Sequence, residues 1–266
     1  MSASPAAQAI LDRLQSVAEL GQRRRSGAEG QAQAAAGAAW VMPLKAYQAA
    51  RFQRTYADLL DGRVAAGRYA AGARFFLDEL YGPKDFSARD AQFSRVVPTL
   101  VRLFPAALVD TVAELVELHA LSEQMDDAMA QQLARQQAEA VAPSEPATPT
   151  LNATAYIRAW QAVGQPAARE RQITLTMNMM TALEKHTRHR LLRVGLRAMR
   201  GAAHAAGLGA LQDFLEAGFD TFGAMGDIGP FHTLVAQRER ALAAALFKAP
   251  VTGDAGQPDT ALQWLP

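Results

Sequence analysis

The hydrophobic pattern of the chain repeats with the period of an α-helix and never with that of a β-strand. No stretch alternates apolar and polar residues, valine and isoleucine are sparse, and alanine and leucine are abundant. Such residues favour helices, whereas alternation with period two indicates a half-buried strand. Half of the 266 residues are hydrophobic and a fifth are charged, so a sizeable core can form. The sequence therefore predicts an all-α fold, a helical bundle of about eight or nine helices with no sheet.

Proline, glycine and capping residues divide the chain into nine expected helices. These cover residues 5–24, 43–60, 63–80, 88–103, 105–140, 152–163, 167–203, 208–225 and 230–248. The best linker is 141–150, which contains three prolines among small polar residues. We expect an N-terminal helical half over 1–140, whose residues 1–39 can lie at its periphery. Residues 26–39 are expected to form a linker or a weak helix. A C-terminal half over 151–249 is expected to pack on the first, before a loosely ordered tail over 250–266.

The composition excludes several kinds of site. The chain has no cysteine, so disulfides, thiolate metal sites and cysteine nucleophiles are excluded. The first residues, MSASPAAQAILDRLQ, carry charges early and lack the apolar core of a signal peptide. No run of about 18 apolar residues is present, so we expect no membrane span and a cytoplasmic protein. No nucleophile elbow, Walker loop, His-Glu-x-x-His pair or dinucleotide fingerprint occurs, which lowers the expectation of a common enzyme.

The stretch from Arg74 to Pro105 has strong signals for a helix end and a helix start. Tyr81-Gly82-Pro83 ends one helix, and Ser87-Ala88-Arg89-Asp90 begins another with a capping serine. This block, FFLDELYGPKDFSARD, resembles the signature of a bacterial all-helical family classed as a domain of unknown function. The segments LVELHALSEQMDDAM and MRGAAHAAGLGALQDFLEAGFDTFGAM match as well, so the resemblance covers most of residues 40–248. It implies a compact helical fold, and it implies no activity and no catalytic residue.

A stripe of basic residues is the first candidate site. Lys185 to Arg200 contains six Lys or Arg residues and no acid. At 100° per residue, one face of the expected 167–203 helix carries His186, Arg190, Arg193, Arg197 and Arg200. The opposite face is expected to be core and carries Ile173, Met177, Met180, Leu191, Val194 and Ala198. The basic face could bind phosphates, an anionic lipid surface or an acidic partner. Alternatively, it could be solvated or could face the acidic segments 110–139 and 208–227 of the same fold.

A row of His119, Glu123 and Asp126 is the second candidate, because these residues are spaced to lie on one side of a helix. Beside an apolar face their carboxylates would be partly desolvated, as in a metal site or an acid–base pair. Glu184 lies within the apolar arc of the 167–203 helix and needs a buried partner, such as His119 or an arginine. The alternative is a structural network of ion pairs. No cofactor is predicted.

The third candidate is a pocket beside Tyr81, Arg89 and Arg95, where two arginines could clamp a carboxylate or phosphate. The alternative is a salt-bridged corner that fixes the angle between two helices. Taken together, the residues favour a non-enzymatic interaction or regulatory protein that uses a basic helix face, with a protein partner or self-association. Nucleic acid is not expected, because the stripe has no aromatic residues to stack on bases. The alternative function is a helical-bundle metal- or ligand-binding protein or enzyme with a His/carboxylate site, and peripheral attachment to an anionic surface is a third.

Overall fold

The computed structural model describes residues 5–26, 32–79, 82, 87–103, 106–140, 151–250 and 259–266. The regular structure within these ranges is all helical and contains no β-strand, which confirms the predicted fold class. None of the described helices is both long enough and apolar enough to cross a membrane.

Eleven α-helices occur in the described residues, so the predicted count of eight or nine is too low. They are α1 (Pro5–Ser26), α2 (Ala32–Thr55), α3 (Ala57–Leu60), α4 (Ala70–Glu79), α5 (Ser87–Leu103), α6 (Ala106–Ala140), α7 (Ala153–Val163), α8 (Pro166–Thr187), α9 (Arg190–Ala205), α10 (Gly209–Met225) and α11 (Gly229–Lys248). Two short 3-10 helices are η1 (Ala65–Gly67) and η2 (Thr260–Trp264). The count differs because the expected helices 43–60 and 167–203 are each divided in two.

Helix ends follow the sequence where the signals are local. α7 begins after Asn152, whose side-chain oxygen accepts a hydrogen bond from the Ala155 N–H at 2.9 Å. It ends at Gly164, which has a φ of 66° that favours glycine. α8 opens on Pro166, where a missing N–H removes no helical hydrogen bond. The sequence predicted this boundary because each residue acts on its own backbone or on its neighbours.

Two segments differ from expectation because tertiary packing orders them. α2 begins at Ala32 and continues through Pro43, whereas the sequence predicts a helix start at Pro43. The alanine-rich stretch has high helix propensity, and Trp40 is buried, so packing extends the helix towards its N-terminus. The expected loosely ordered tail is wrong for residues 259–266, because Ala261 and Leu265 are buried in the core.

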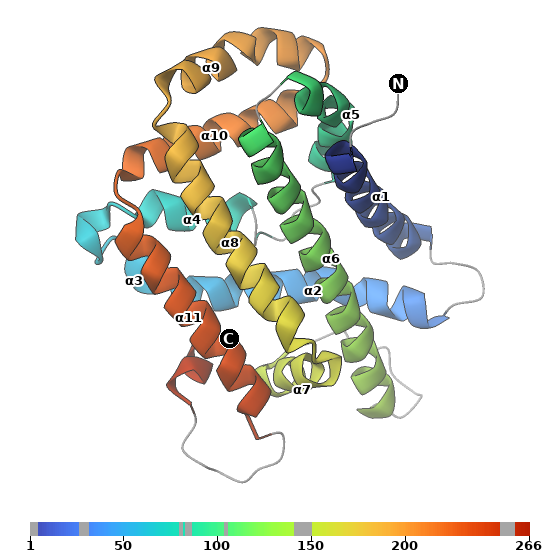
Figure 1. Ribbon diagram of the computed structural model, residues 1–266. Helices are drawn as coiled ribbons and strands as arrows, with labels where there is room; N and C mark the ends of the chain where they lie inside the picture. The colour runs from blue at the N-terminus through green and yellow to red at the C-terminus, as the bar shows by residue number, and fades with distance from the viewer. Residues whose placement is uncertain are drawn as a thin grey trace.

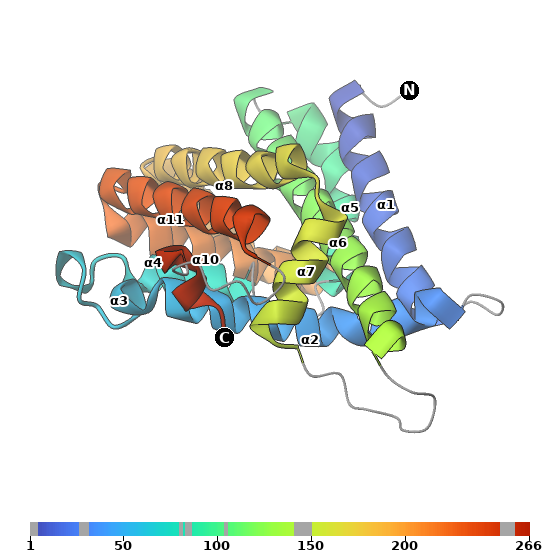
Figure 2. The same cartoon turned by 90° about the horizontal axis from the view of Figure 1, so that it is seen from below.

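The helices form two crossing layers (Figures 1 and 2). α8 packs against α6 on one side and against α11 on the other, and α2 and α4 cross behind them. α1 and α5 lie together beside the first half of α6. α9 lies across the end of the molecule where α8 finishes, and its main packing partner is α10 (Figure 1).

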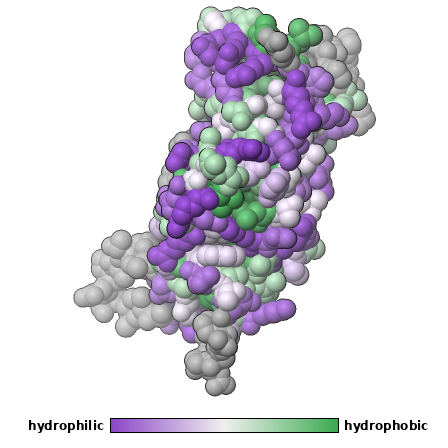
Figure 3. All heavy atoms as spheres, turned by 90° about the vertical axis from the view of Figure 1, so that its left-hand side faces the viewer, coloured by the Kyte–Doolittle hydropathy of each residue, from purple (hydrophilic) through white to green (hydrophobic). Residues whose placement is uncertain are grey.

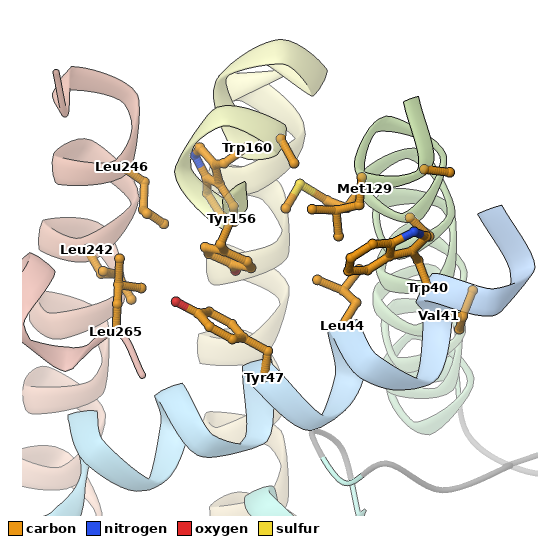
Figure 4. Packing of buried hydrophobic residues seen from close by; sticks show 14 of the residues in the cluster. Trp40, Val41, Leu44, Tyr47, Met129, Tyr156, Trp160, Leu242, Leu246 and Leu265 are labelled. Carbon is orange, nitrogen blue, oxygen red and sulfur yellow. The ribbon is translucent and has the colours of Figure 1, made fainter. Parts of the chain in front are cut away.

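Buried residues form three hydrophobic clusters, here called cores 1, 2 and 3. Core 1 joins α2, α6, α7, α11 and η2, and Figure 4 shows the ring of Tyr47 against that of Tyr156 at its centre, 4.8 Å apart. Core 2 is centred on the aromatic residues Tyr56, Phe76, Phe222 and Phe231 between α2, α4, α10 and α11. Core 3 lies between α1, α5, α6 and α10. The long α6 therefore contributes to two cores at opposite ends.

The expected 167–203 helix is divided at His189, which has a non-helical backbone (φ −85°, ψ 95°). Beyond the break, α9 turns its arginines towards acidic residues of α10, namely Asp220 and Glu216. The expectation that Leu191 and Val194 are core is wrong, because their side chains are 86% and 62% exposed. Three of the six clustered cations, Arg193, Arg197 and Arg200, thus pair with carboxylates of α10 beyond the break.

Candidate functional site

A cavity of about 170 Å³ lies along the seam between α6 and α8. The two helices run antiparallel here (Figure 1), and Gln172 Nε2 of α8 donates to Ser122 Oγ of α6 at 3.1 Å. Along α6 the lining extends from Leu115 to Asp126. At the helical rise of 1.5 Å per residue, these eleven steps correspond to roughly 16 Å. The cavity is therefore elongated.

The two ends of the cavity differ in chemistry. The end towards core 3 combines the charged residues Glu79 and Arg89 with apolar ones, namely Leu14, Phe93, Leu115, Val116, Leu211 and Phe214. The end towards core 1 is more highly charged, here called the polar end, and is lined by Lys45, Arg51, Glu123, Asp126, Arg169 and Glu239 beside the apolar Leu242 and Leu246. Tyr156 and Trp160 of α7 close the polar end.

All three residues of the predicted His–carboxylate row, His119, Glu123 and Asp126, line this cavity. Glu123 is held in an ion-pair network rather than left for a metal. It accepts from Lys45 Nζ at 2.5 Å and from Arg24 Nη1 at 2.6 Å. Burial alone would raise the pKa of the Glu123 carboxyl, but the two cations outweigh it and lower that pKa to about 2.

Asp126 has the opposite electrostatic environment. It accepts a hydrogen bond from Gln48 Nε2 at 2.9 Å. Burial is the dominant cause and raises the pKa of the Asp126 carboxyl, although Gln48 and Lys45 act against it. Two carboxyls one helical turn apart thus have pKa values shifted in opposite directions, that of Glu123 downward and that of Asp126 upward. A pair with divergent pKa values is typical of functional sites.

Glu184 does not join this group. Its Oε1 accepts from Arg188 Nη2 at 2.5 Å, one turn further along the chain, and it is not part of the cavity lining. Of the two partners expected for Glu184, the structure thus contains the arginine and not His119. Within the described ranges, no three His, Asp or Glu side chains come together as a group that could hold a metal ion.

Sequence reasoning missed two arginines of the polar end. Arg51 and Arg169 are each only 6% exposed. Arg51 Nη1 donates to Glu239 Oε1 at 2.7 Å, and the guanidinium of Arg169 lies 3.9 Å from the ring centroid of Trp160. The sequence does contain a signal for Arg51, because the helical period places it on the same face of α2 as the apolar Leu44 and Tyr47. A charged residue at such a core position needs buried polar partners and therefore indicates a polar site.

The predicted arginine clamp of Tyr81, Arg89 and Arg95 has no common focus among the described residues. Tyr81 lies outside them. Arg89 lines the cavity, lies 4.7 Å from the Phe214 ring centroid and donates to the Glu79 carbonyl at 3.3 Å. Arg95 donates to the carbonyl of Gly207 at 2.6 Å, which ties α5 to the turn before α10.

The basic stripe packs against acids of α10. Arg193 and Arg197 both pair with Asp220, the second at 3.0 Å. Arg200 Nε donates to Glu216 Oε1 at 3.0 Å, and hydrogen bonds from Arg200 and then from Gln212 lower the pKa of Glu216 to about 2. These contacts correspond to the predicted alternative in which the stripe faces an acidic segment of the same fold.

The two other stripe residues are placed differently. His186 belongs to the last turn of α8, where its Nε2 lies 3.3 Å from Thr111 Oγ1 of α6. Burial, followed by the nearby Lys185 and His189, lowers the pKa of His186. Arg190 begins α9, but its side chain lies outside the described residues.

The outward face of α9 is apolar. Leu191, Val194 and Met199 are 86%, 62% and 59% exposed, and they are three of the four large hydrophobic side chains exposed in the described residues. Together with the small residues between them, these side chains form what is here called the apolar stripe. A Cβ added to Gly195 within it would meet nothing within 4 Å. Figure 3 shows hydrophobic and hydrophilic residues side by side on the surface at this end of the molecule.

These features define an all-helical protein that has a cavity between α6 and α8 lined by charged and apolar residues, and an amphipathic helix with its apolar face outward. The chain belongs to the family described as Domain of unknown function (DUF8198), whose model matches residues 28–252. The family membership expected from the sequence is thereby confirmed. No curated protein and no solved structure matches the chain.

Proposed function

We propose that this protein is a non-enzymatic interaction protein whose binding surface is the outward face of α9, and that it assembles with a second copy of itself. The observation that carries the proposal is the concentration of exposed large hydrophobic side chains on one helix. Exposed apolar side chains gathered on one surface are a common feature of interaction sites. The arginines of this helix support the proposal by anchoring it to α10, so the apolar stripe has a rigid base.

The stripe is self-complementary in size. In an antiparallel pair of α9 helices centred on Ala198, Leu191 lies opposite Ala205 of the partner and Val194 lies opposite Ala202. Leu191 and Val194 then each face a small side chain. A twofold axis through the centre makes each of these contacts occur twice. All five of these residues are exposed in the single chain, so they are accessible to a second copy. Small residues at the centre also permit a close approach of the two helices.

Charge favours the antiparallel arrangement as well. The N-terminal end of α9 lies beside Lys185 and Arg188, and no acid occurs from Lys185 to Arg200. Antiparallel pairing places these cations near the C-terminal end of the partner helix, which carries the negative end of the helix dipole. It also separates the two cationic ends by about the length of a 16-residue helix, roughly 24 Å.

Sedimentation velocity over a concentration series tests this proposal. The wild type should show a reversible dimer, and Leu191→Asp with Val194→Asp should weaken it about 100-fold, because two buried apolar contacts become buried charges. Met42→Asp is the matched control, since Met42 is the fourth exposed large hydrophobic residue and lies on α2. It should leave the dimer unchanged.

Two results would contradict the proposal. One is a wild type that sediments as a monomer throughout the series. The other is a double variant that remains helical by circular dichroism and dimerises as tightly as the wild type. The proposed setting is the cytoplasm, which the absence of cysteine supports.

A further inference from the structure

The segment of residues 259–266 is attached to the helices through two buried side chains. Ala261 and Leu265 are 3% and 6% exposed and belong to core 1. The segment contacts α11 and α2, and Figure 2 shows it beside α11. Other side chains of the same segment, such as those of Thr260 and Gln263, are exposed. The segment therefore lies on the helices as a peptide that is anchored at two points four residues apart.

The backbone of this segment makes its hydrogen bonds within the segment. Asp259 Oδ1 accepts from the Ala261 N–H at 2.9 Å, and the Leu265 N–H donates to the Leu262 carbonyl at 3.1 Å. Among the hydrogen bonds between described residues, one joins the segment to a helix, since Arg54 Nη1 of α2 donates to the Leu265 carbonyl. Few bonds therefore have to break when the segment leaves its place, and no helix loses a hydrogen bond of its own backbone.

The place that the segment covers contains a buried hydroxyl without an acceptor. It is here called the α2–α11 surface and is defined by Tyr47 and Arg54 of α2 and Leu242 of α11. Tyr47 is 6% exposed, and Figure 4 shows its hydroxyl directed towards Leu242 and Leu265. No hydrogen-bond partner reaches this hydroxyl among the described residues. A buried hydroxyl that makes no hydrogen bond is unfavourable, so the segment leaves part of the α2–α11 surface unsatisfied.

The α2–α11 surface and the segment differ in their relation to the family. The family model matches residues 28–252, which include Tyr47, Arg54 and Leu242. The 259–266 segment lies beyond this range. The surface thus belongs to the part of the chain that matches the family, and its occupant does not.

We propose that the α2–α11 surface is a docking site for a short peptide segment of another protein, and that residues 259–266 cover it in the free chain as an internal competitor. The partner segment carries a small residue and a leucine four positions apart, as Ala261 and Leu265 are. It also offers an acceptor to the Tyr47 hydroxyl, and this hydrogen bond favours it over the internal segment.

A second copy of the chain is not the occupant, because it offers the same segment and gains no such bond. The site is also independent of the assembly proposed for α9, since neither α2 nor α11 contributes to the apolar stripe.

Fluorescence anisotropy of a labelled synthetic peptide of residues 257–266, titrated with the full chain, tests the proposal. The peptide should bind the Leu265→Asp chain at least tenfold more tightly than the wild type. In the wild type the covalently attached segment competes at an effective concentration on the order of millimolar. Gln263→Asp is the matched control, since Gln263 is exposed in the same segment, and it should bind the peptide as the wild type does. A Leu265→Asp chain that binds no peptide, or no more tightly than the wild type, would overturn the proposal.

A second substitution locates the bound peptide. Arg54→Gln, added to the Leu265→Asp chain, should weaken peptide binding at least threefold, because the charged donor to the leucine carbonyl is lost. Arg63→Gln is the matched control, since Arg63 pairs with the exposed Asp61, and it should leave the affinity unchanged. A peptide that binds equally well with and without Arg54→Gln would reject the α2–α11 surface as its site.

Electron paramagnetic resonance provides a measurement that keeps Leu265 in place. The chain contains no cysteine, so a spin label can be attached at Gln263→Cys alone. An excess of the unlabelled peptide should sharpen the spectrum of this label, because the internal segment leaves the surface and moves more freely. A label at Lys248→Cys, exposed in the last turn of α11, should keep its spectrum. If saturating peptide leaves the spectrum at residue 263 unchanged, the segment is not an internal competitor.

Discussion

At the scale of single residues, the polar end of the cavity is maintained against the preference of a protein core for apolar groups. Asp126 is the clearest case, because burial raises the pKa of its carboxyl and only a neutral amide, Gln48, donates to it among the hydrogen bonds described. A residue that lowers stability where it stands is characteristic of sites kept for a function. Replacing it should therefore stabilise the fold.

We expect Asp126→Asn to raise the free energy of unfolding at neutral pH. The amide oxygen can still accept from Gln48, while the cost of ionising a buried carboxyl disappears. The folded-state pKa lies above the unfolded value of 3.8, so wild-type stability falls as the pH rises from that value through the folded pKa. The increase in the free energy of unfolding caused by Asp126→Asn should thus be small near pH 4 and largest near pH 8.

Urea unfolding at several pH values measures this effect. Asp127→Asn is the matched control, since Asp127 is adjacent in sequence and accepts from Arg24 Nε at 3.1 Å. It should lower the stability, because a charge-assisted hydrogen bond is lost. If Asp126→Asn destabilises the protein as much as the control does, the electrostatic description of Asp126 is wrong.

The sequence anticipated part of this site and missed the rest for a physical reason. His119, Glu123 and Asp126 were predicted to share one side of a helix, which needs only the helical period. Their partners Lys45, Arg24 and Gln48 come from other helices, and which residues meet across helices depends on packing that no local pattern encodes. For the same reason, the ionised state of Glu123 could not be distinguished in advance from that of Asp126.

At the scale of elements, α9 is held in place by a small number of ion pairs. Asp220 is central because it accepts from both Arg193 and Arg197. Burial on its own would raise the pKa of Asp220, but the two arginines lower it overall. The apolar face of α9 points away from α10, so hydrophobic burial contributes less to holding this helix than it does for α8.

We expect Asp220→Asn to loosen α9 without unfolding the protein. Because exposed ion pairs contribute about 0.2–1 kcal/mol each, amide hydrogen exchange in α9 should become several-fold faster. Exchange in α8 should stay as it is in the wild type. Hydrogen-exchange mass spectrometry measures both helices in one experiment.

The control for this variant is Asp61→Asn, which removes the exposed pair with Arg63 at 2.8 Å, away from α9. It should change exchange only near its own turn. An α9 that exchanges at the wild-type rate in Asp220→Asn would mean that Arg200 and Glu216 suffice to hold the helix.

The presence of the helices could be predicted from the sequence, whereas the direction in which α9 leaves α8 could not. Asn152, Gly164 and Pro166 act locally, so the boundary between α7 and α8 was predicted. The break at His189 has neither proline nor glycine to mark it. It depends on acids of α10 that lie more than twenty residues away in sequence, and the same contacts decide that the apolar face of α9 points outward.

At the scale of the whole molecule, paired carboxylates connect the helices to one another. Six of them have lowered pKa values: Asp58, Glu117, Glu123, Glu170, Glu216 and Asp220. A lowered folded-state pKa means that the contribution to stability is present above the unfolded pKa and is lost as the pH falls. The protein should therefore be most sensitive to acid between about pH 4.5 and pH 2.

We expect the free energy of unfolding to decrease steadily over that pH range, and Glu123→Gln to remove part of the decrease. For Glu123 the shift from 4.5 to about 2 corresponds to about 3 kcal/mol at neutral pH. Urea unfolding at low and at high salt separates the contribution of exposed ion pairs from that of buried ones. Salt should screen the exposed pair of Glu170 with Arg240 and leave that of Glu123 with Lys45 largely intact.

Stability that stays constant or increases from pH 5 to pH 3 would contradict this prediction. A Glu123→Gln variant with the same acid profile as the wild type would contradict the assignment to that residue.

The exposure of Met199 gives α9 a chemical reactivity that most of the described methionines lack. Six methionines are at most 5% exposed, namely Met125, Met129, Met177, Met179, Met180 and Met225, whereas Met199 and Met42 are half exposed or more. A mild peroxide should therefore oxidise these two thioethers first. The sulfoxide is polar, so oxidation at Met199 would place a hydrophilic group on the surface proposed for assembly and should make that assembly sensitive to oxidants.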